Sequence, residues 1–188
     1  VGVDGQAWCW GPNDYGQLGT GDVSQGNAPR RTAEGHAFSK ISVSTGGAYA
    51  CGITAAGRAY CWGNQEGGRL GDGINAPSGQ HVTAPVPVAG DRTYSDIATG
   101  GDHACAIATG GAGYCWGHNE RGQLGTGSFS NSTVPVAVSG GLRFTPIFAH
   151  QMGTCGIADG GIAHCWGEGS SGNLGGGIFV SSPGISDP

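Results

Sequence analysis

The stretch YCWGHNERGQLGTG, residues 114–127, decides the fold of this 188-residue chain because near copies of it occur three more times. Each copy holds a tryptophan followed by glycine, and the four tryptophans are 52, 54 and 50 residues apart: Trp10, Trp62, Trp116 and Trp166. A leucine stands eight residues after each tryptophan: Leu18, Leu70, Leu124 and Leu174. Repeats of about 20 to 50 residues are typical of solenoids and propellers, in which each repeat is one supersecondary unit. The sequence therefore predicts a repeat protein.

A β-hairpin is expected directly before each tryptophan. In AYACGITAAGRAYCWG, residues 48–63, two alternating runs flank the segment 54–57. If Cys51 faces Cys61, the hairpin closes on a three-residue loop, and such loops favour a left-handed residue in their last position. Gly57 occupies that position here, and the other copies also have glycine there: Gly5, Gly111 and Gly161.

Two proline-containing runs, 84–90 and 133–140, read as outer strands, because proline is tolerated at a sheet edge. New units begin at Ile41, Ile97 and Ile147. About four short strands per unit is the content of one propeller blade. We therefore predict an all-β partial propeller of four-stranded antiparallel blades, in which the tryptophan and leucine positions pack blade against blade. The expected units are a partial blade at 1–40, blades at 41–96 and 97–146, and a last unit at 147–188 whose completeness is left open.

Composition excludes several classes of protein. The chain has 41 glycines, and each glycine costs roughly 1 kcal/mol relative to alanine inside a helix, which disfavours long helices. A formal net charge of −5 with only eight Lys plus Arg argues against nucleic-acid binding, which needs a basic surface. No apolar run approaches the ~20 residues of a transmembrane helix, so membrane insertion is not expected.

Six of the seven cysteines form pairs ten residues apart at opposed hairpin positions: Cys51 and Cys61, Cys105 and Cys115, and Cys155 and Cys165. Opposed antiparallel residues lie close enough for a disulfide. Cys9 matches Cys61, and its partner would stand two positions before Val1, so we expect truncation to leave it unpaired. Disulfides place the protein in an oxidising compartment, extracellular or periplasmic. Free buried cysteines are the alternative.

With these motifs the sequence resembles the regulator of chromosome condensation repeat family. WGPNDYGQLGTG (10–21), WGHNERGQLGTG (116–127) and PVAVSG (135–140) carry the resemblance, and residues 62–73 and 166–177 are looser copies. The family implies a β-propeller, usually of seven blades, so missing blades or a second chain would complete the ring. Its members include an exchange factor for a small GTPase, parts of ubiquitin-ligase scaffolds and a secreted bacterial inhibitor of β-lactamases. The paired cysteines are similar to the secreted, often bacterial, members.

No motif for chemistry stands out. The glycine-rich segments lack the phosphate-loop pattern, there is no G-x-S-x-G, and there is no C-x-x-C for zinc. We expect no catalytic, cofactor or metal site. What varies is the loop between the tryptophan and leucine anchors, and variable loops on a rigid scaffold commonly bind partners. The candidate partner-binding residues are Tyr15, Glu66, His118, Glu120 and Arg121. Solvated turn residues are the alternative interpretation of each.

These observations favour a secreted, non-enzymatic module that binds another protein, in the manner of an inhibitor or an adhesin. The alternatives are an accessory propeller domain of a larger enzyme, a glycan-binding propeller and an intracellular GTPase-regulating scaffold. A glycan-binding propeller is expected to copy one polar-aromatic pocket in each blade, which the variable loops here do not do.

Overall fold

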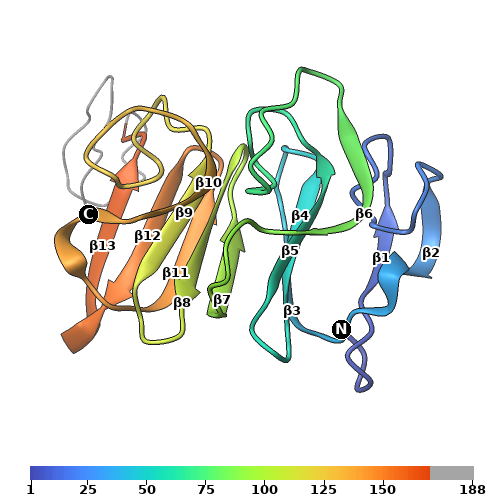
Figure 1. The fold of residues 1–188 in the computed structure, drawn as a ribbon, viewed down its shortest axis with the longest axis horizontal. Helices are drawn as coiled ribbons and strands as arrows, with labels where there is room; N and C mark the ends of the chain where they lie inside the picture. The colour runs from blue at the N-terminus through green and yellow to red at the C-terminus, as the bar shows by residue number, and fades with distance from the viewer. Residues whose placement is uncertain (170–188) are drawn as a thin grey trace.

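The computed structural model describes residues 1–169 as successive antiparallel sheets that stand side by side (Figure 1). Leu174 and the end of the last expected unit lie outside the described residues. The first sheet pairs β1 (Trp8–Gly11) with β2 (Gly26–Arg31). The strands of the other sheets are β3 (Phe38–Val43), β4 (Tyr49–Thr54), β5 (Ala59–Asn64) and β6 (His81–Pro87); β7 (Tyr94–Thr99), β8 (His103–Ala108), β9 (Gly113–Gly117) and β10 (Ser132–Ala137); and β11 (Phe144–His150), β12 (Gly153–Ala158) and β13 (Ile162–Gly167).

The second and third sheets are complete propeller blades. Their strand orders are β3-β4-β5-β6 and β7-β8-β9-β10, and every neighbouring pair is antiparallel. We number the blades in chain order, so that β1–β2 belong to blade 1 and β11–β13 to blade 4. The predicted all-β fold with four-stranded blades is confirmed. Within residues 1–169 no helix has the length or apolar character needed to cross a membrane.

Each blade's first strand begins before the isoleucine at which the sequence placed the start of a unit. β3 begins at Phe38 rather than at Ile41, because its pairing with β4 continues across a register shift to Phe38 opposite Thr54. Blades 3 and 4 extend in the same way, to Tyr94 and Phe144. These aromatic side chains are buried against the tryptophan of their own blade, and the rings of Phe144 and Trp166 have centroids 5.6 Å apart. The extension thus adds a ring to each core.

The hairpins have the predicted register. Cys51 pairs with Cys61, and Gly57 closes the loop at a φ of 80°, where glycine has no steric penalty. Disulfides join the cysteines at this position in blades 2, 3 and 4, with Cα–Cα distances of 4.0, 4.0 and 4.1 Å. Among the described residues Cys9 is the free cysteine. The prediction of paired cysteines is confirmed for all three pairs.

Blades meet along seams in which the tryptophan of one blade packs on the preceding blade. The indole nitrogen of Trp116 donates to the backbone oxygen of Arg69 at 3.1 Å, and a Cβ on Gly71 would lie 2.7 Å from that ring. Trp62 and Trp166 make the same hydrogen bond to the backbone oxygens of Gln17 and Gln123, at 2.9 and 3.0 Å. These three tryptophans are 0% exposed. Glycine after the leucine is therefore required to let the indole approach.

Candidate functional site

One end of the blades carries the loops that vary between repeats. Antiparallel order brings the turn between a blade's first and second strands to the same end as the loop between its third and fourth strands, the upper end in Figure 1. We call this end the loop face. It consists of turns 44–48, 100–102 and 151–152 and of loops 12–25, 65–80 and 118–131. All five predicted partner-binding residues stand on these loops.

A buried asparagine holds two of the three described loops in shape. Asn119 is 0% exposed, its Oδ1 accepts a hydrogen bond from the backbone nitrogen of Leu124 at 2.9 Å, and its Nδ2 donates to the carbonyls of Ser128 and Ser130 at 2.8 and 3.0 Å. Asn13 is equally buried and makes the matching bonds in the first loop. These side chains lie inside segments that the sequence analysis treated as variable. Asparagine three residues after tryptophan was the available signal.

The loop of blade 2 is held differently because Arg69 replaces a glutamine. In blade 3 the Oε1 of Gln123 accepts from the backbone nitrogen of Arg121 at 2.9 Å. Arginine has no acceptor, so the Nε of Arg69 instead donates to the carbonyl of Glu66 at 2.7 Å. Its Nη1 donates to the carbonyl of Gly47 at 3.1 Å.

Arg69 also joins two blades through an ion pair. Its Nη1 lies 2.9 Å from Oδ1 of Asp102, in the turn between β7 and β8, while the guanidinium side chain is only 6% exposed. Nη2 lies 3.8 Å from Oε2 of Glu66. Two carboxylates thus balance one nearly buried cation, which would be costly to bury alone. The sequence analysis missed both Arg69 and Asp102, although arginine in place of glutamine in the repeat was a visible departure.

Beneath the loop face a buried histidine ties blade 3 to blade 4. The hydroxyl of Thr154 donates to the backbone oxygen of Gln123 at 2.9 Å, so at 2.8 Å it accepts from Nε2 of His103. His103 is 0% exposed, and burial lowers its pKa to about 3, with further lowering from His150 nearby. A neutral ring protonated at Nε2 is therefore the form present at neutral pH.

The matched position in blade 2 is a tyrosine. Tyr49 pairs with Gly63 as His103 pairs with Gly117. Its hydroxyl donates to the carbonyls of His103 and Gly100. Burial raises the pKa of Tyr49, so the hydroxyl stays protonated and remains a donor. Both seams thus end in a buried polar side chain that does not carry charge at neutral pH.

The five predicted residues differ in their exposure and in their contacts. Tyr15 and Glu120 are exposed, each on its own loop. Glu66 is half-buried, accepts from the hydroxyl of Ser78 at 3.3 Å and belongs to the Arg69 network. His118 packs across the seam on the neighbouring loop, where a Cβ on Gly67 would lie 1.9 Å from its Nε2. Glu66 and His118 therefore both lie near the seam of blades 2 and 3, and the half-buried Arg121 follows on the same loop as His118 and Glu120.

The described residues of the loop face do not form a metal-binding cluster. Over the part of the chain that the structure describes, no group of three or more His, Cys, Asp or Glu side chains is placed to hold a metal ion. The loop face carries polar and aromatic side chains on a frame whose hairpins are linked by disulfides.

Four-stranded blades joined by repeated seams define this protein as a β-propeller of short repeats. Sequence comparison matches the Regulator of chromosome condensation (RCC1) repeat at residues 4–53, 56–107 and 111–157. The chain belongs to the RCC1 repeat family.

Relatives of known name share the repeat and extend well beyond it. The chain is 34% identical over 127 residues to the human E3 ubiquitin-protein ligase HERC2, a match that covers 66% of this chain and 2% of that protein. It is 31% identical over 122 residues to the mitochondrial RCC1 domain-containing protein RUG3 of Arabidopsis thaliana, which covers 65% of this chain and 27% of RUG3. The chain thus spans a minor part of these relatives.

Solved structures show the same fold over nearly the whole chain. Human WBSCR16 superposes with a TM-score of 0.82 at 20% identity, covering 95% of this chain and 47% of that one. Prp20p of Saccharomyces cerevisiae gives 0.81 at 21% identity, with 97% and 45% covered. The described blades therefore have the arrangement of about half of such a propeller.

Proposed function

We propose that this chain is part of a secreted, non-enzymatic scaffold that binds a protein partner through its loop face. The observation that carries the proposal is the contrast between frame and loops. The tryptophan seams and disulfides recur from blade to blade, whereas the matched loop position five residues after tryptophan is Tyr15, then Gly67, then Arg121. Tyrosine and arginine are enriched at the energetic centres of protein interfaces.

Two further observations support a protein partner over a nucleic acid. The net charge of −5 gives no excess of cations with which to bind phosphates. Among structural relatives, yeast RCC1 (Prp20) has been solved bound to Kap60, and another study concerns its binding to Gsp1p and histones. Those partners are properties of Prp20, and they support only the general use of such a propeller as a protein-binding surface.

The binding proposal is tested by comparing variants at the two ends of the blades. Immobilised wild-type chain, Tyr15→Ala, Arg121→Ala and the opposite-end control Ala56→Ser are each exposed to the secreted fraction of the source organism. Recovered proteins are quantified by mass spectrometry. A protein that loses about tenfold or more in recovery with the loop variants, and none with the control, is the expected partner. Equal recovery by all variants of matched thermal stability would contradict binding through the loop face.

The compartment is tested by counting thiols in protein taken from its native location. Alkylation followed by peptide mass mapping is expected to leave Cys51, Cys61, Cys105, Cys115, Cys155 and Cys165 unlabelled before reduction and to label them after it. Labelling of all six before reduction would contradict secretion. That outcome would favour the second candidate function, an accessory propeller of an intracellular enzyme, for which the 34% identity to a ubiquitin ligase is the supporting observation.

A further inference from the structure

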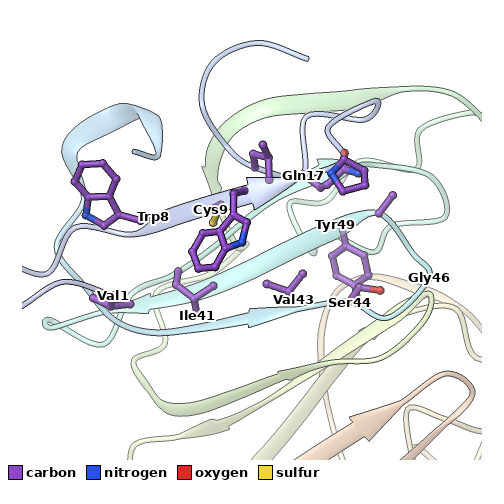
Figure 2. Close-up of a pocket in the computed structure, with 13 residues that line it drawn as sticks. Val1, Trp8, Cys9, Gln17, Ile41, Val43, Ser44, Gly46 and Tyr49 are labelled. Carbon is purple, nitrogen blue, oxygen red and sulfur yellow. The ribbon is translucent and has the colours of Figure 1, made fainter. Parts of the chain in front are cut away.

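Two of the five tyrosines in this chain are buried, and their hydroxyl groups are bonded differently. Tyr49 lies at one end of the groove between blades 1 and 2 (Figure 2), and its hydroxyl donates to the carbonyls of Gly100 and His103. Tyr94 is only 4% exposed, yet its hydroxyl oxygen is buried without a hydrogen-bond partner among the described residues. A buried hydroxyl without a partner costs free energy, and such groups are normally satisfied by water or by a ligand.

Packing does not require the hydroxyl of Tyr94. Phe38 and Phe144 occupy the matched position at the start of the first strand in blades 2 and 4. Each of these rings packs on the tryptophan of its own blade, as the ring of Tyr94 does. Phenylalanine therefore fills the same space without a polar atom. Tyrosine in blade 3 adds a donor that the packing does not use.

Two arginines lie close to this hydroxyl. The guanidinium carbon of Arg92 is 4.3 Å from the centroid of the Tyr114 ring, which meets Tyr94 edge to face with centroids 6.5 Å apart. Arg58 follows Gly57 on the hairpin of blade 2, and the carbonyl of Gly57 accepts from the backbone nitrogen of Tyr94 at 2.8 Å. Burial raises the pKa of Tyr94, although the positive charges of Arg92 and Arg58 oppose the rise. The hydroxyl thus stays protonated, and arginine cannot accept its hydrogen.

The residues of this cluster depart from the repeat. Blades 2 and 4 have His36 and Leu142 in the place of Arg92, and no other hairpin has arginine in the place of Arg58. Tyr94 is the only tyrosine among the aromatic residues that begin the first strands. The cluster belongs to the seam of blades 2 and 3, at the end of the blades opposite the loop face, the lower end in Figure 1. We call this end the hairpin end.

The charges of the cluster favour a ligand with a single negative charge. The carboxylate of Asp91 is fully exposed and lies 3.5 Å from Nη1 of Arg58. Arg58, Arg92 and Asp91 together leave one positive charge. A carboxylate would neutralise that charge, whereas a phosphate dianion would leave excess negative charge beside Asp91. A carboxylate also has two oxygens, which suits one guanidinium and one phenol as donors.

We propose that Arg92 and the hydroxyl of Tyr94 form a binding site for a carboxylate group, with Arg58 adding positive charge at its edge. One carboxylate oxygen accepts from the guanidinium of Arg92, and the other accepts from the hydroxyl of Tyr94. Arg92 is exposed, so its side chain can shift on the ring of Tyr114 to admit the ligand. The site lies at the hairpin end, so it does not depend on partner binding at the loop face.

The test follows the Nε–Hε signals of the arginines by NMR in the ¹⁵N-labelled 188-residue chain. Sodium acetate replaces sodium chloride at constant ionic strength. The Arg92 signal, assigned by its loss in Arg92→Lys, is expected to shift along a saturable curve. Tyr94→Phe should weaken the apparent affinity about tenfold, since it removes a hydrogen bond to a charged group. Arg143→Gln, which removes another exposed arginine at the hairpin end, should leave the affinity unchanged.

An absent shift of the Arg92 signal, or equal affinities of wild type and Tyr94→Phe, would overturn the proposal. Inorganic phosphate that binds more tightly than acetate would overturn the choice of a carboxylate.

Two peptides distinguish a small carboxylic acid from an acidic polypeptide as the source of the carboxylate. They are acetyl-Gly-Glu-Gly-amide and the same peptide with glutamine in place of glutamate. If the glutamate peptide binds more tightly than acetate, the site takes an acidic side chain of a polypeptide. If the two bind equally, it takes small carboxylic acids. Binding of the glutamine peptide as tightly as the glutamate peptide would overturn the proposal, because the charge would then not be recognised.

Thermal unfolding shows whether the hydroxyl is free before a ligand binds. In sodium chloride, Tyr94→Phe is expected to leave the midpoint unchanged or to raise it, because the variant removes a hydroxyl without a partner. Replacing chloride with acetate should raise the midpoint of wild type more than that of Tyr94→Phe. A lower midpoint of Tyr94→Phe in chloride would show that the hydroxyl is already bonded in the free protein, and this result would overturn the proposal.

Discussion

Blades 2 and 3 have the same strand order, the same disulfide and the same tryptophan seam, yet they fill matched polar positions with different side chains. The pairs, blade 2 first, are Tyr49 and His103, Gln65 and Asn119, and Arg69 and Gln123. In blade 3 the side chains of Asn119 and Gln123 form hydrogen bonds with backbone groups of their own loop. In blade 2 Arg69 reaches the neighbouring blade. One backbone frame therefore accommodates two hydrogen-bonding arrangements.

The shared frame gives the largest expected effect. Trp116→Ala should lower the free energy of unfolding by about 3–5 kcal/mol, because it empties a fully buried site at the seam of blades 2 and 3. Urea unfolding followed by circular dichroism measures the change. Trp10→Ala is the matched control and should cost less than about 1 kcal/mol, since surface substitutions rarely cost more. Equal losses would contradict a packed seam.

The second prediction is that His103 makes the free energy of unfolding depend on pH, whereas Tyr49 does not. The folded-state pKa of His103 is about 3, below the unfolded value of 6.5, so the unfolded chain binds more protons between these values. Its contribution is fully present above pH 6.5 and is lost as pH falls toward 3. From pH 7 to pH 4 the free energy of unfolding should drop by about 2–3 kcal/mol on this account.

His103→Gln keeps a donor toward Thr154 and should remove that part of the pH dependence, as measured by urea unfolding at each pH. Tyr49→Phe should lower stability without changing the slope, because its hydroxyl does not titrate in this range. Identical slopes for wild type and His103→Gln would show that other groups cause the dependence.

The third prediction compares the loop asparagine with its counterpart. Asn119→Ala leaves the backbone groups of Leu124, Ser128 and Ser130 without their partner and should cost about 2–3 kcal/mol. Gln65→Ala removes one bond to the carboxylate of Asp72 and should cost about 1 kcal/mol or less. Thermal unfolding of both variants measures the difference, and a larger effect of Gln65→Ala would contradict the role of the buried asparagine.

The smallest effect concerns the bridge between blades. Asp102→Asn should cost about 1 kcal/mol, since the carboxylate is half exposed and solvent weakens the pair with Arg69. In an Arg69→Gln background the same substitution should have no measurable effect, so a double-mutant cycle isolates the pair. Asp91→Asn serves as the control. Asp91 is fully exposed, and the substitution would remove only its ion pair with Arg58, in which Nη1 and Oδ1 lie 3.5 Å apart. Additive effects of Arg69→Gln and Asp102→Asn would contradict the bridge.

Repetition made the frame predictable from sequence. The hairpin register, the paired cysteines and the blade composition follow from residues that recur in phase, because each copy tests the interpretation of the others. The start of each unit was placed inside the first strand because the isoleucines repeat clearly. The aromatic residues that begin the strands differ, as Phe38, Tyr94 and Phe144.

Contacts between blades were harder to predict. The pair Arg69 and Asp102 joins residues 33 positions apart in different repeats, and neither residue is repeated in its neighbours. His103 likewise depends on Thr154, which the other blades replace with alanine, as at Ala50 and Ala104. Periodicity identifies the residues that the repeats have in common, whereas the contacts at the loop face are made by residues that differ between repeats. The partner-binding role of Tyr15, Glu66, His118, Glu120 and Arg121 therefore stays a prediction.

The direction of the tryptophan hydrogen bonds has a consequence for how the chain is made. Each indole donates to a carbonyl that lies 43 to 47 residues earlier in the sequence, never later, in the three described seams. During synthesis the acceptor carbonyl and its glycine leave the ribosome before the ring that will dock there. The tryptophan of each new blade can therefore pack on a backbone carbonyl and glycine of the preceding blade that have already been synthesised. Assembly can therefore proceed in step with translation, from the amino-terminal blade onward.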